Sequence, residues 1–197
     1  MRRLTPADYR RMPWRNGGGT TTEIVIAPEG ASASGERFLY RVSIADVGSD
    51  GPFSRFDGYD RHIMLLSGAG MTLDCGAHGR VDLRTPFEPH AFSGDWDVAG
   101  ALVDGPVRDF NLMVDRARST ATLEVKVLDE RSPSAAISLT PRDVCIMHVI
   151  EGALEGADQG DTLVTNAPNA PFELRSRAGA NGIARVAIAR ISERSRP

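Results

Sequence analysis

The stretch FLYRVSIA, residues 38–45, alternates strictly between two sets of side chains. One set is Phe38, Tyr40, Val42 and Ile44, and the other is Leu39, Arg41, Ser43 and Ala45. Because successive side chains of a β-strand point to opposite faces, this period of two predicts a strand with one wholly apolar side. The other side carries a guanidinium and a hydroxyl group.

The same signal recurs along most of the chain. Strands are predicted over residues 20–27, 62–66, 71–75, 81–83, 98–103, 107–114, 123–128, 145–150, 160–164 and 183–191. Turn signals separate them, including small-residue or proline turns at 32–36 and 168–171. Short strands at this spacing favour an all-β barrel or sandwich. In the strand at 107–114, Asp109 and Asn111 are notable because both are poor strand formers.

A short helix is predicted at the N-terminus. Thr5 is a capping residue, Pro6 suits the first helical position, and Asp8 places an acid in the first turn. Pro13 is expected to end this helix after about two turns.

A weak internal repeat suggests two similar halves. Residues 145–152, CIMHVIEG, echo residues 62–68, HIMLLSG, as an apolar strand closed by a turn glycine. We therefore expect two β-barrels side by side, the first with the helix over residues 1–117 and a smaller second one over 118–197. The second half lacks counterparts of the polar positions in the first, so chemistry is expected in the first barrel.

Composition restricts the function. The chain has 197 residues, of which 41% are hydrophobic, and a formal net charge of -3. It can bury a full core, but it has no strong field to attract nucleic acid or an acidic membrane surface. The apolar runs are too short for a signal peptide or a membrane span, so a cytoplasmic location is expected. Cys75 and Cys145 lie in separate strand-like runs, which predicts free, buried thiols.

Two loops carry unusual side chains. The segment MPWRNGGGTTTE, residues 12–23, combines an indole, a guanidinium, an amide, three glycines and a carboxylate. Its glycines permit backbone torsions closed to other residues, which predicts a tight loop with amides free to face a ligand. It lacks the preceding strand and the following lysine of a nucleotide-binding loop. Residues 51–61 form a second loop, whose three aromatics predict that it folds back over the protein.

Together these segments predict a pocket for a small anion. Arg41 and Arg61 would offer planar guanidinium groups to a carboxylate. The full set of candidate ligand-binding residues is Trp14, Asn16, Gly18, Gly19, Thr22, Glu23, Arg41, Ser43, Arg61, Asp95 and Asn111. Each has a purely structural alternative: a solvated strand face for Arg41 and Glu23, a salt bridge of Arg61 with Asp57 or Asp60, a buried amide for Asn111, and a core or interface anchor for Trp14.

Metal and cofactor sites are not predicted. A divalent ion needs three or four converging nitrogen and oxygen donors, and a closely spaced His-x-His pair would supply two of them. The four histidines, His62, His78, His90 and His148, form no such pair, and only His90 with Asp95 is faintly ligand-like. No nucleophile motif of the Gly-x-Ser-x-Gly type is present either.

Several of these segments resemble those of a known protein family. The segments PWRNGGGTTTE at 13–23, YRVSIA at 40–45, GPFSRFDGYDR at 51–61, FSGD at 92–95 and DFNLM at 109–113 together resemble the HutD/Ves family. The resemblance implies a bicupin fold, an association with bacterial histidine utilisation, and a small-molecule pocket in the first barrel with a regulatory, sensing role. The sequence departs from a common form of the motif at Arg15, often Lys, and at Asp57, often Pro.

Three hypotheses of different classes follow. The first is a metal-free bicupin that binds a carboxylated or formylated intermediate of histidine breakdown, such as formylglutamate, urocanate or formate. The second is an enzyme of hydrolase or isomerase type, with Glu23 or Asp95 as general base in the same pocket. The third is a partner-binding protein whose glycine loop and aromatics form the face of a homodimer. The expected partner is a small carboxylate, not nucleic acid or membrane.

Overall fold

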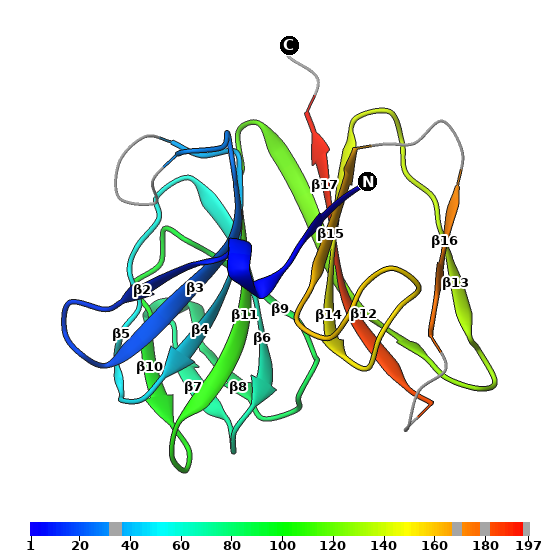
Figure 1. Ribbon diagram of the computed structural model, residues 1–197. Coiled ribbons are helices and arrows are strands. Elements are labelled where there is room, and N and C mark those ends of the chain that lie inside the picture. Colours follow the sequence, from blue (N-terminus) through cyan, green and yellow to red (C-terminus); the bar gives the residue numbers. More distant parts are fainter. Residues whose placement is uncertain (32–36, 167–170, 178–181, 195–197) are drawn as a thin grey trace. The chain divides into compact units, whose positions relative to one another are not determined.

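The computed structural model describes residues 1–31, 37–166, 171–177 and 182–194, which form an almost entirely β structure (Figure 1). The turns expected at 32–36 and, apart from its last residue, at 168–171 lie outside the described residues. The chain divides into two compact units. The first unit is Arg10–Ser119, and the second unit combines Met1–Tyr9 with Thr120–Pro197.

The first unit contains two antiparallel sheets. A six-stranded sheet has the order β2-β3-β4-β11-β6-β9, and a four-stranded sheet has the order β5-β10-β7-β8. The strands of the larger sheet are β2 Arg10–Pro13, β3 Gly19–Ala27, β4 Tyr40–Val47, β11 Val107–Asp115, β6 Tyr59–Ser67 and β9 His90–Ser93. Those of the smaller sheet are β5 Gly51–Pro52, β10 Ala99–Leu102, β7 Met71–Asp74 and β8 Arg80–Leu83.

The alternation read from the sequence fixes the faces of the larger sheet. On β4, Ala45 and Val47 join an apolar core with Ile63 and Leu65 of β6. Met71, Leu73 and Leu83 of the smaller sheet belong to the same core, so the two sheets face each other across it. The opposite face of the larger sheet is also buried, with Val42 and Leu112 both at 0% exposure. Both faces of β4 and β11 are therefore inaccessible to bulk water except where a cavity opens.

The second unit repeats this pattern on a smaller scale. Its five-stranded sheet has the order β1-β15-β14-β17-β12, and β13 pairs with β16. The strands are β1 Arg2–Leu4, β15 Thr162–Asn166, β14 Asp143–Glu151, β17 Ala184–Glu193, β12 Ser119–Leu128, β13 Ser134–Ile137 and β16 Phe172–Arg175. Apolar side chains fill its core, including Met147, Val149 and Ile188. The predicted all-β class is confirmed.

The N-terminal prediction needs correction. In place of a two-turn helix, a single 3-10 turn spans Pro6–Asp8, held by Thr5, whose backbone amide donates to Asp8 Oδ2 at 2.8 Å. The chain straightens because Arg10–Pro13 pairs with β3 as strand β2. Residues 1–9, expected with the first barrel, are grouped with the second unit because β1 pairs with β15.

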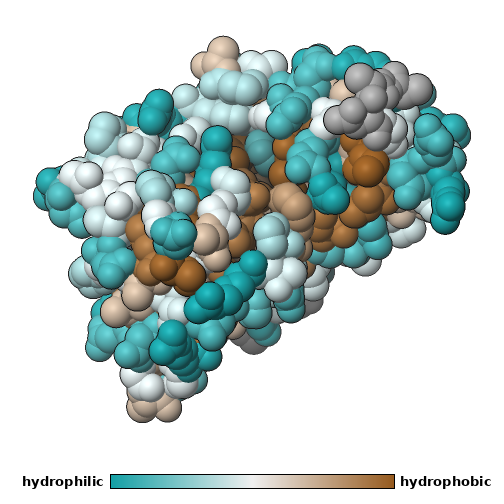
Figure 2. Space-filling model, turned by 90° about the horizontal axis from the view of Figure 1, so that it is seen from below, coloured by the Kyte–Doolittle hydropathy of each residue, from teal (hydrophilic) through white to brown (hydrophobic). Residues whose placement is uncertain are grey.

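The cysteines, a second short helix and the surface complete the description of the fold. Cys75 and Cys145 are both free and buried, as predicted. A second short 3-10 helix, η2, spans Gly76–His78. No helix in the described ranges is long and apolar enough to cross a membrane. On the surface, patches of apolar residues are surrounded by hydrophilic ones (Figure 2).

Candidate functional site

A cavity of about 500 Å³ opens inside the first unit, and we call it the barrel pocket. One wall comes from the larger sheet, through Arg41, Ser43, Arg61, Asp109 and Asn111. The opposite wall comes from Gly51, Met71 and Gly100 of the smaller sheet and from Phe53, which follows β5. Trp14 and Asn16, in the loop between β2 and β3, also line the pocket. The pocket therefore has a polar wall facing an apolar one.

The strand register explains how the polar wall is assembled. Glu23, Ser43 and Asn111 lie directly opposite one another on β3, β4 and β11. Arg41, Met113 and Arg61 form the next row, across β4, β11 and β6. Side chains in such rows stand within contact distance on one face of a sheet. Residues nearly a hundred positions apart in sequence thus become neighbours.

Arg41 does not lie on a solvated strand face. It is 6% exposed, and its Nε donates to Glu23 Oε2 at 2.6 Å in an ion pair whose two side chains are both buried. Glu23 is therefore a partner of Arg41 and does not itself line the pocket. The pair is close to neutral as a unit, since each charge has a partner in the low-dielectric interior.

Arg61 is held differently. The expected partners are engaged elsewhere: Asp57 pairs with Arg55, and Asp60 pairs with Arg116. Its guanidinium donates to the Ser54 carbonyl at 3.2 Å and to Asn111 Oδ1 at 3.3 Å, while its Nε has no partner.

Three aromatic rings surround the Arg61 guanidinium. The rings of Phe53, Phe56 and Phe92 lie at 5.4, 5.6 and 4.8 Å from its Cζ atom. Burial lowers the pKa of Arg61 to about 10, which still leaves it cationic at neutral pH. Two of these rings come from the aromatic loop at 51–61, which folds back as predicted.

Asp109 is the main residue that the sequence-based candidate set missed. It is 1% exposed and lines the pocket beside Asn111, whose Nδ2 donates to its Oδ1. Its Oδ2 has no hydrogen-bond partner. Burial raises the pKa of Asp109 to about 7, against the opposing effects of Arg61 and Asn111. The available signal was an Asp within a strand, on the same side as Asn111.

The glycines of the hairpin loop pack against the protein itself. A Cβ on Gly19 would lie 2.5 Å from the Asp46 carbonyl oxygen and 2.9 Å from the Trp14 ring, and one on Gly18 would lie 2.5 Å from Ser49 Oγ. Trp14 Nε1 in turn donates to Thr21 Oγ1 at 2.8 Å, and Asn16 Oδ1 accepts from the Gly18 amide at 3.0 Å. These contacts keep the loop close to β4.

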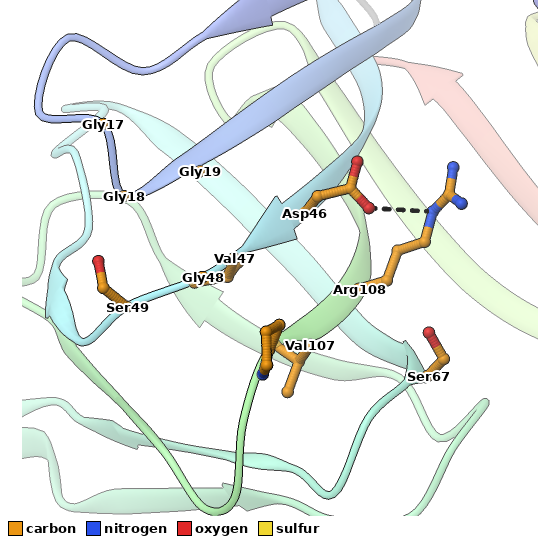
Figure 3. Close-up of a pocket in the computed structure, with 11 residues that line it drawn as sticks. Gly17, Gly18, Gly19, Asp46, Val47, Gly48, Ser49, Ser67, Val107 and Arg108 are labelled. Carbon is orange, nitrogen blue, oxygen red and sulfur yellow. Dashed lines mark ion pairs between the residues drawn. The ribbon is translucent and has the colours of Figure 1, made fainter.

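A second hollow, the glycine groove, lies on the other side of this loop. It is lined by Gly17, Gly18, Gly19, Asp46, Val47, Gly48, Ser49, Ser67, Pro106, Val107 and Arg108. Figure 3 shows the Arg108 side chain reaching Asp46, to which its Nε lies at 3.6 Å. Gly18 and Gly19 therefore border this groove and not the barrel pocket.

The eleven candidates thus separate into groups. Trp14, Asn16, Arg41, Ser43, Arg61 and Asn111 line the barrel pocket, Gly18 and Gly19 line the groove, and Thr22, Glu23 and Asp95 line neither. Thr22 follows Thr21, which faces the pocket, and alternation directs it to the opposite face.

Asp95 has a structural environment. It accepts from Arg116 Nη1 at 2.7 Å and from the Gly58 amide at 2.5 Å. These bonds lower the pKa of Asp95 to about 2, which makes it a poor general base near neutral pH. Among the described residues, no group of three or more His, Cys, Asp or Glu side chains is arranged to hold a metal ion.

Comparison with known families gives a clear match. The family model described as HutD covers residues 6–181. The chain belongs to the HutD family. A curated relative from Pseudomonas putida, an uncharacterized 21.2 kDa protein in the hutC 3' region, is 44% identical over 121 residues. That match covers 61% of this chain and 62% of the relative, so this HutD-family chain spans about six tenths of that relative's length.

Two solved structures match almost the whole HutD-family chain. A conserved protein of unknown function from Pseudomonas aeruginosa PAO1 is 31% identical with a TM-score of 0.82, covering 97% of this chain and 98% of the other. HutD from Pseudomonas fluorescens SBW25, in a formate condition, is 30% identical with a TM-score of 0.76, covering 98% and 99%. A cupin 2 conserved barrel domain protein from Leptotrichia buccalis, 10% identical over 94% and 96% with a TM-score of 0.51, shares the fold alone. The protein is thus a cupin-like member of the HutD family, and the family resemblance is confirmed.

Proposed function

We propose that this HutD-family protein binds a small carboxylated or formylated intermediate of histidine breakdown in the barrel pocket and regulates that pathway through its occupancy. The candidate ligands are formylglutamate, urocanate and formate. The single observation that supports this most is Arg61: a buried cation on the pocket wall whose Nε has no partner. The proposal places the protein in the cytoplasm and requires no metal or cofactor.

The environment of Arg61 favours a carboxylate. A guanidinium presents its donors in a planar fork that a carboxylate meets with two parallel bonds. Around Arg61 the aromatic rings exclude water, and in such surroundings a charge-assisted hydrogen bond is stronger than in bulk solvent. Trp14 and Phe53 offer apolar surface to the remainder of a small ligand.

One of the matched structures is a HutD protein in a formate condition. Formate is the smallest carboxylate among the proposed ligands, so it is the simplest probe of the pocket.

Calorimetric titration tests the proposal. Formylglutamate, urocanate and formate are each titrated into the protein, and at least one is expected to bind saturably. Replacing Arg61 by Ala removes a charge-assisted contact of about 1.5–3 kcal/mol, so the affinity should fall by about 10- to 100-fold.

Arg55→Ala is the matched control. Arg55 lies on the same loop but is exposed, with 49% of its side chain accessible, and pairs with Asp57. Its replacement should leave the affinity unchanged. Absence of binding by all three compounds would overturn the assignment to this pathway, and equal losses in both variants would rule out Arg61 as the anion-binding group.

A further inference from the structure

Asp109 occupies an unusual position for a carboxylate. It lies near the start of β11, opposite Ala45 of β4 and Leu65 of β6, and is almost fully buried. Its Oδ1 accepts a hydrogen bond from Asn111 Nδ2. Its Oδ2 makes no hydrogen bond, although Asp109 borders the barrel pocket. An ionised oxygen that is buried without a partner is costly, and the cost falls if it is protonated or contacts a ligand.

The charges around Asp109 can be counted strand by strand. On β6 the charged group is Arg61, and on β4 it is Arg41, which is already paired with Glu23 of β3. Asp46 of β4 is on the groove side, next to Arg108 of β11. The smaller sheet contributes the uncharged Met71 and Gly100, and the charged rim residues Arg15 and Asp50 are exposed.

This count leaves two buried groups that determine the charge of the pocket wall. Arg41 and Glu23 cancel, so the balance rests on Arg61 and Asp109. If Asp109 is ionised the wall is neutral, whereas if Asp109 is protonated the wall carries one positive charge. Only the second state matches a carboxylate, because a second anion next to an ionised Asp109 would be repelled.

We infer that the barrel pocket takes up one proton with each carboxylate group it binds, and that Asp109 holds this proton on Oδ2 and donates it to a ligand oxygen while Arg61 pairs with the same carboxylate. This inference rests on the proposed carboxylate-binding function and names Asp109 as the residue that selects a singly charged group. The proton comes from solvent, and no covalent bond to the ligand forms or breaks.

The acidity of Asp109 agrees with this role. Burial raises the pKa of Asp109 to about 7 in the free protein, so near neutral pH protonation requires little free energy. A bound anion raises this pKa further. Binding therefore takes up protons at any pH between the free and the bound pKa, and affinity falls as the pH rises above about 7, by up to tenfold per pH unit.

The test is a calorimetric titration of the wild-type protein with formate at pH 8 in two buffers of different ionisation enthalpy. The difference in heat gives the number of protons exchanged, and about one proton taken up per formate is expected. Formate is fully ionised at this pH, so the proton must be bound by the protein. A second titration series from pH 6 to pH 8.5 should show constant affinity below about pH 6.5 and a decrease above pH 7.

Asp109→Asn is the decisive variant, because an amide has the shape of a neutral carboxylic acid and cannot take up the proton. It should bind formate with no proton uptake and with a pH-independent affinity, about tenfold tighter than wild type at pH 8. Asp57→Asn is the control and should behave as wild type, because 72% of the Asp57 side chain is exposed.

The outcomes separate the two proposals. Formate binding without proton uptake in the wild-type protein would overturn the role of Asp109 and leave the ligand assignment standing. Unchanged proton uptake in Asp109→Asn would do the same. No binding of formate, formylglutamate or urocanate at any pH would overturn both.

Discussion

The two units of this protein share a strand order but differ in what the inner face of the sheet carries. In the first unit, the order β4-β11-β6-β9 corresponds to β12-β17-β14-β15 in the second. Strands β6 and β14 are each followed by a glycine with positive φ, Gly68 and Gly152. The weak sequence repeat between 62–68 and 145–152 is thus a correspondence between central strands.

Aligning Gly68 with Gly152 matches the residues of β6 with those of β14 on the inner faces of the two sheets. Asp109 pairs with Leu65 and Asn111 with Ile63 in the first unit. Val186 pairs with Val149 and Ile188 with Met147 at the matching positions of the second. Arg61 corresponds in the same way to Cys145. Where the first unit has a polar wall and a cavity, the second has an apolar core.

This difference shows that one framework can enclose either a filled core or a cavity with polar walls. In the second unit the inner side chains contribute stability through burial. In the first, the same positions hold polar groups that are partly unsatisfied, which costs stability and leaves donors and acceptors beside the cavity. Exchanging residues between matching positions should therefore have opposite consequences in the two units.

The largest destabilisation is expected for Ile188→Asn, which places the matching residue of the first unit, an asparagine, in the apolar core of the second. Ile188 is fully buried, so the change loses apolar contacts and buries an amide without partners. The free energy of unfolding should fall by about 4 kcal/mol, measured by urea denaturation.

Asn111→Ile is the reciprocal variant. It removes hydrogen bonds to Asp109 and Arg61, but it places an apolar side chain beside a cavity and does not disturb a filled core. The free energy of unfolding should fall by less than about 2 kcal/mol, while carboxylate binding is lost. If the two variants were destabilised equally, the distinction between a core and a binding wall would be wrong.

A smaller effect is expected for Gly152→Ala, at the glycine that ends the central strand of the second unit. Its φ is +70°, and an added Cβ would collide with the Ile183 carbonyl oxygen. The variant should be destabilised by about 3 kcal/mol in urea denaturation, from the left-handed backbone and the clash together.

Gly156→Ala separates these two causes. Gly156 has a φ of +84°, but nothing lies within 4 Å of an added Cβ. Only the backbone strain remains, so a loss of about 1 kcal/mol is expected. If both variants lost the same free energy of unfolding, the close contact with the Ile183 carbonyl oxygen would not be the reason for a glycine at position 152.

An effect of opposite sign is expected for Asp109→Asn at pH 8. The folded-state pKa of Asp109, about 7, lies above the ordinary value for Asp, about 3.9. Between these values the folded protein binds more protons than the unfolded chain, so the contribution of Asp109 to stability is full below about pH 4 and is lost as the pH rises through 7.

Asp109→Asn cannot ionise at this position, so it does not lose this stability as the pH rises. It should therefore match the wild type near pH 4 and exceed it by about 4 kcal/mol at pH 8, measured from urea denaturation at the two pH values. A variant less stable than wild type at pH 8 would show that ionised Asp109 has a stabilising partner. Asp57→Asn is the control and should be about as stable as the wild type, because Asp57 is exposed.

Much of the fold could be predicted from local sequence. The alternation at 38–45 and 107–114 predicted β4 and β11 and the correct face for Arg41, Ser43, Asp109 and Asn111. The N-terminal helix was wrong because local capping signals at Thr5 and Pro6 compete with the long-range pairing of β2 and β1. Pairing over such distances has no local signature.

The site was only partly predictable for the same reason. The sequence could nominate Arg61, but the aromatic rings around it and its bond to Asn111, 50 residues away, depend on the fold. Glu23 was assigned to the ligand, whereas the register places it against Arg41. Asp95 was nominated on the strength of a motif, and the structure surrounds it with Arg116 and the Gly58 amide.

By itself, then, the sequence determined the all-β class, the family and the faces of the central strands, because a period of two is a local property of the chain. Only the tertiary structure decided which inner faces enclose a cavity and which are filled, and which charges remain without partners. Those properties depend on strand register and on the facing sheet, which bring together residues far apart in sequence. The unpartnered oxygen of Asp109 is the clearest example.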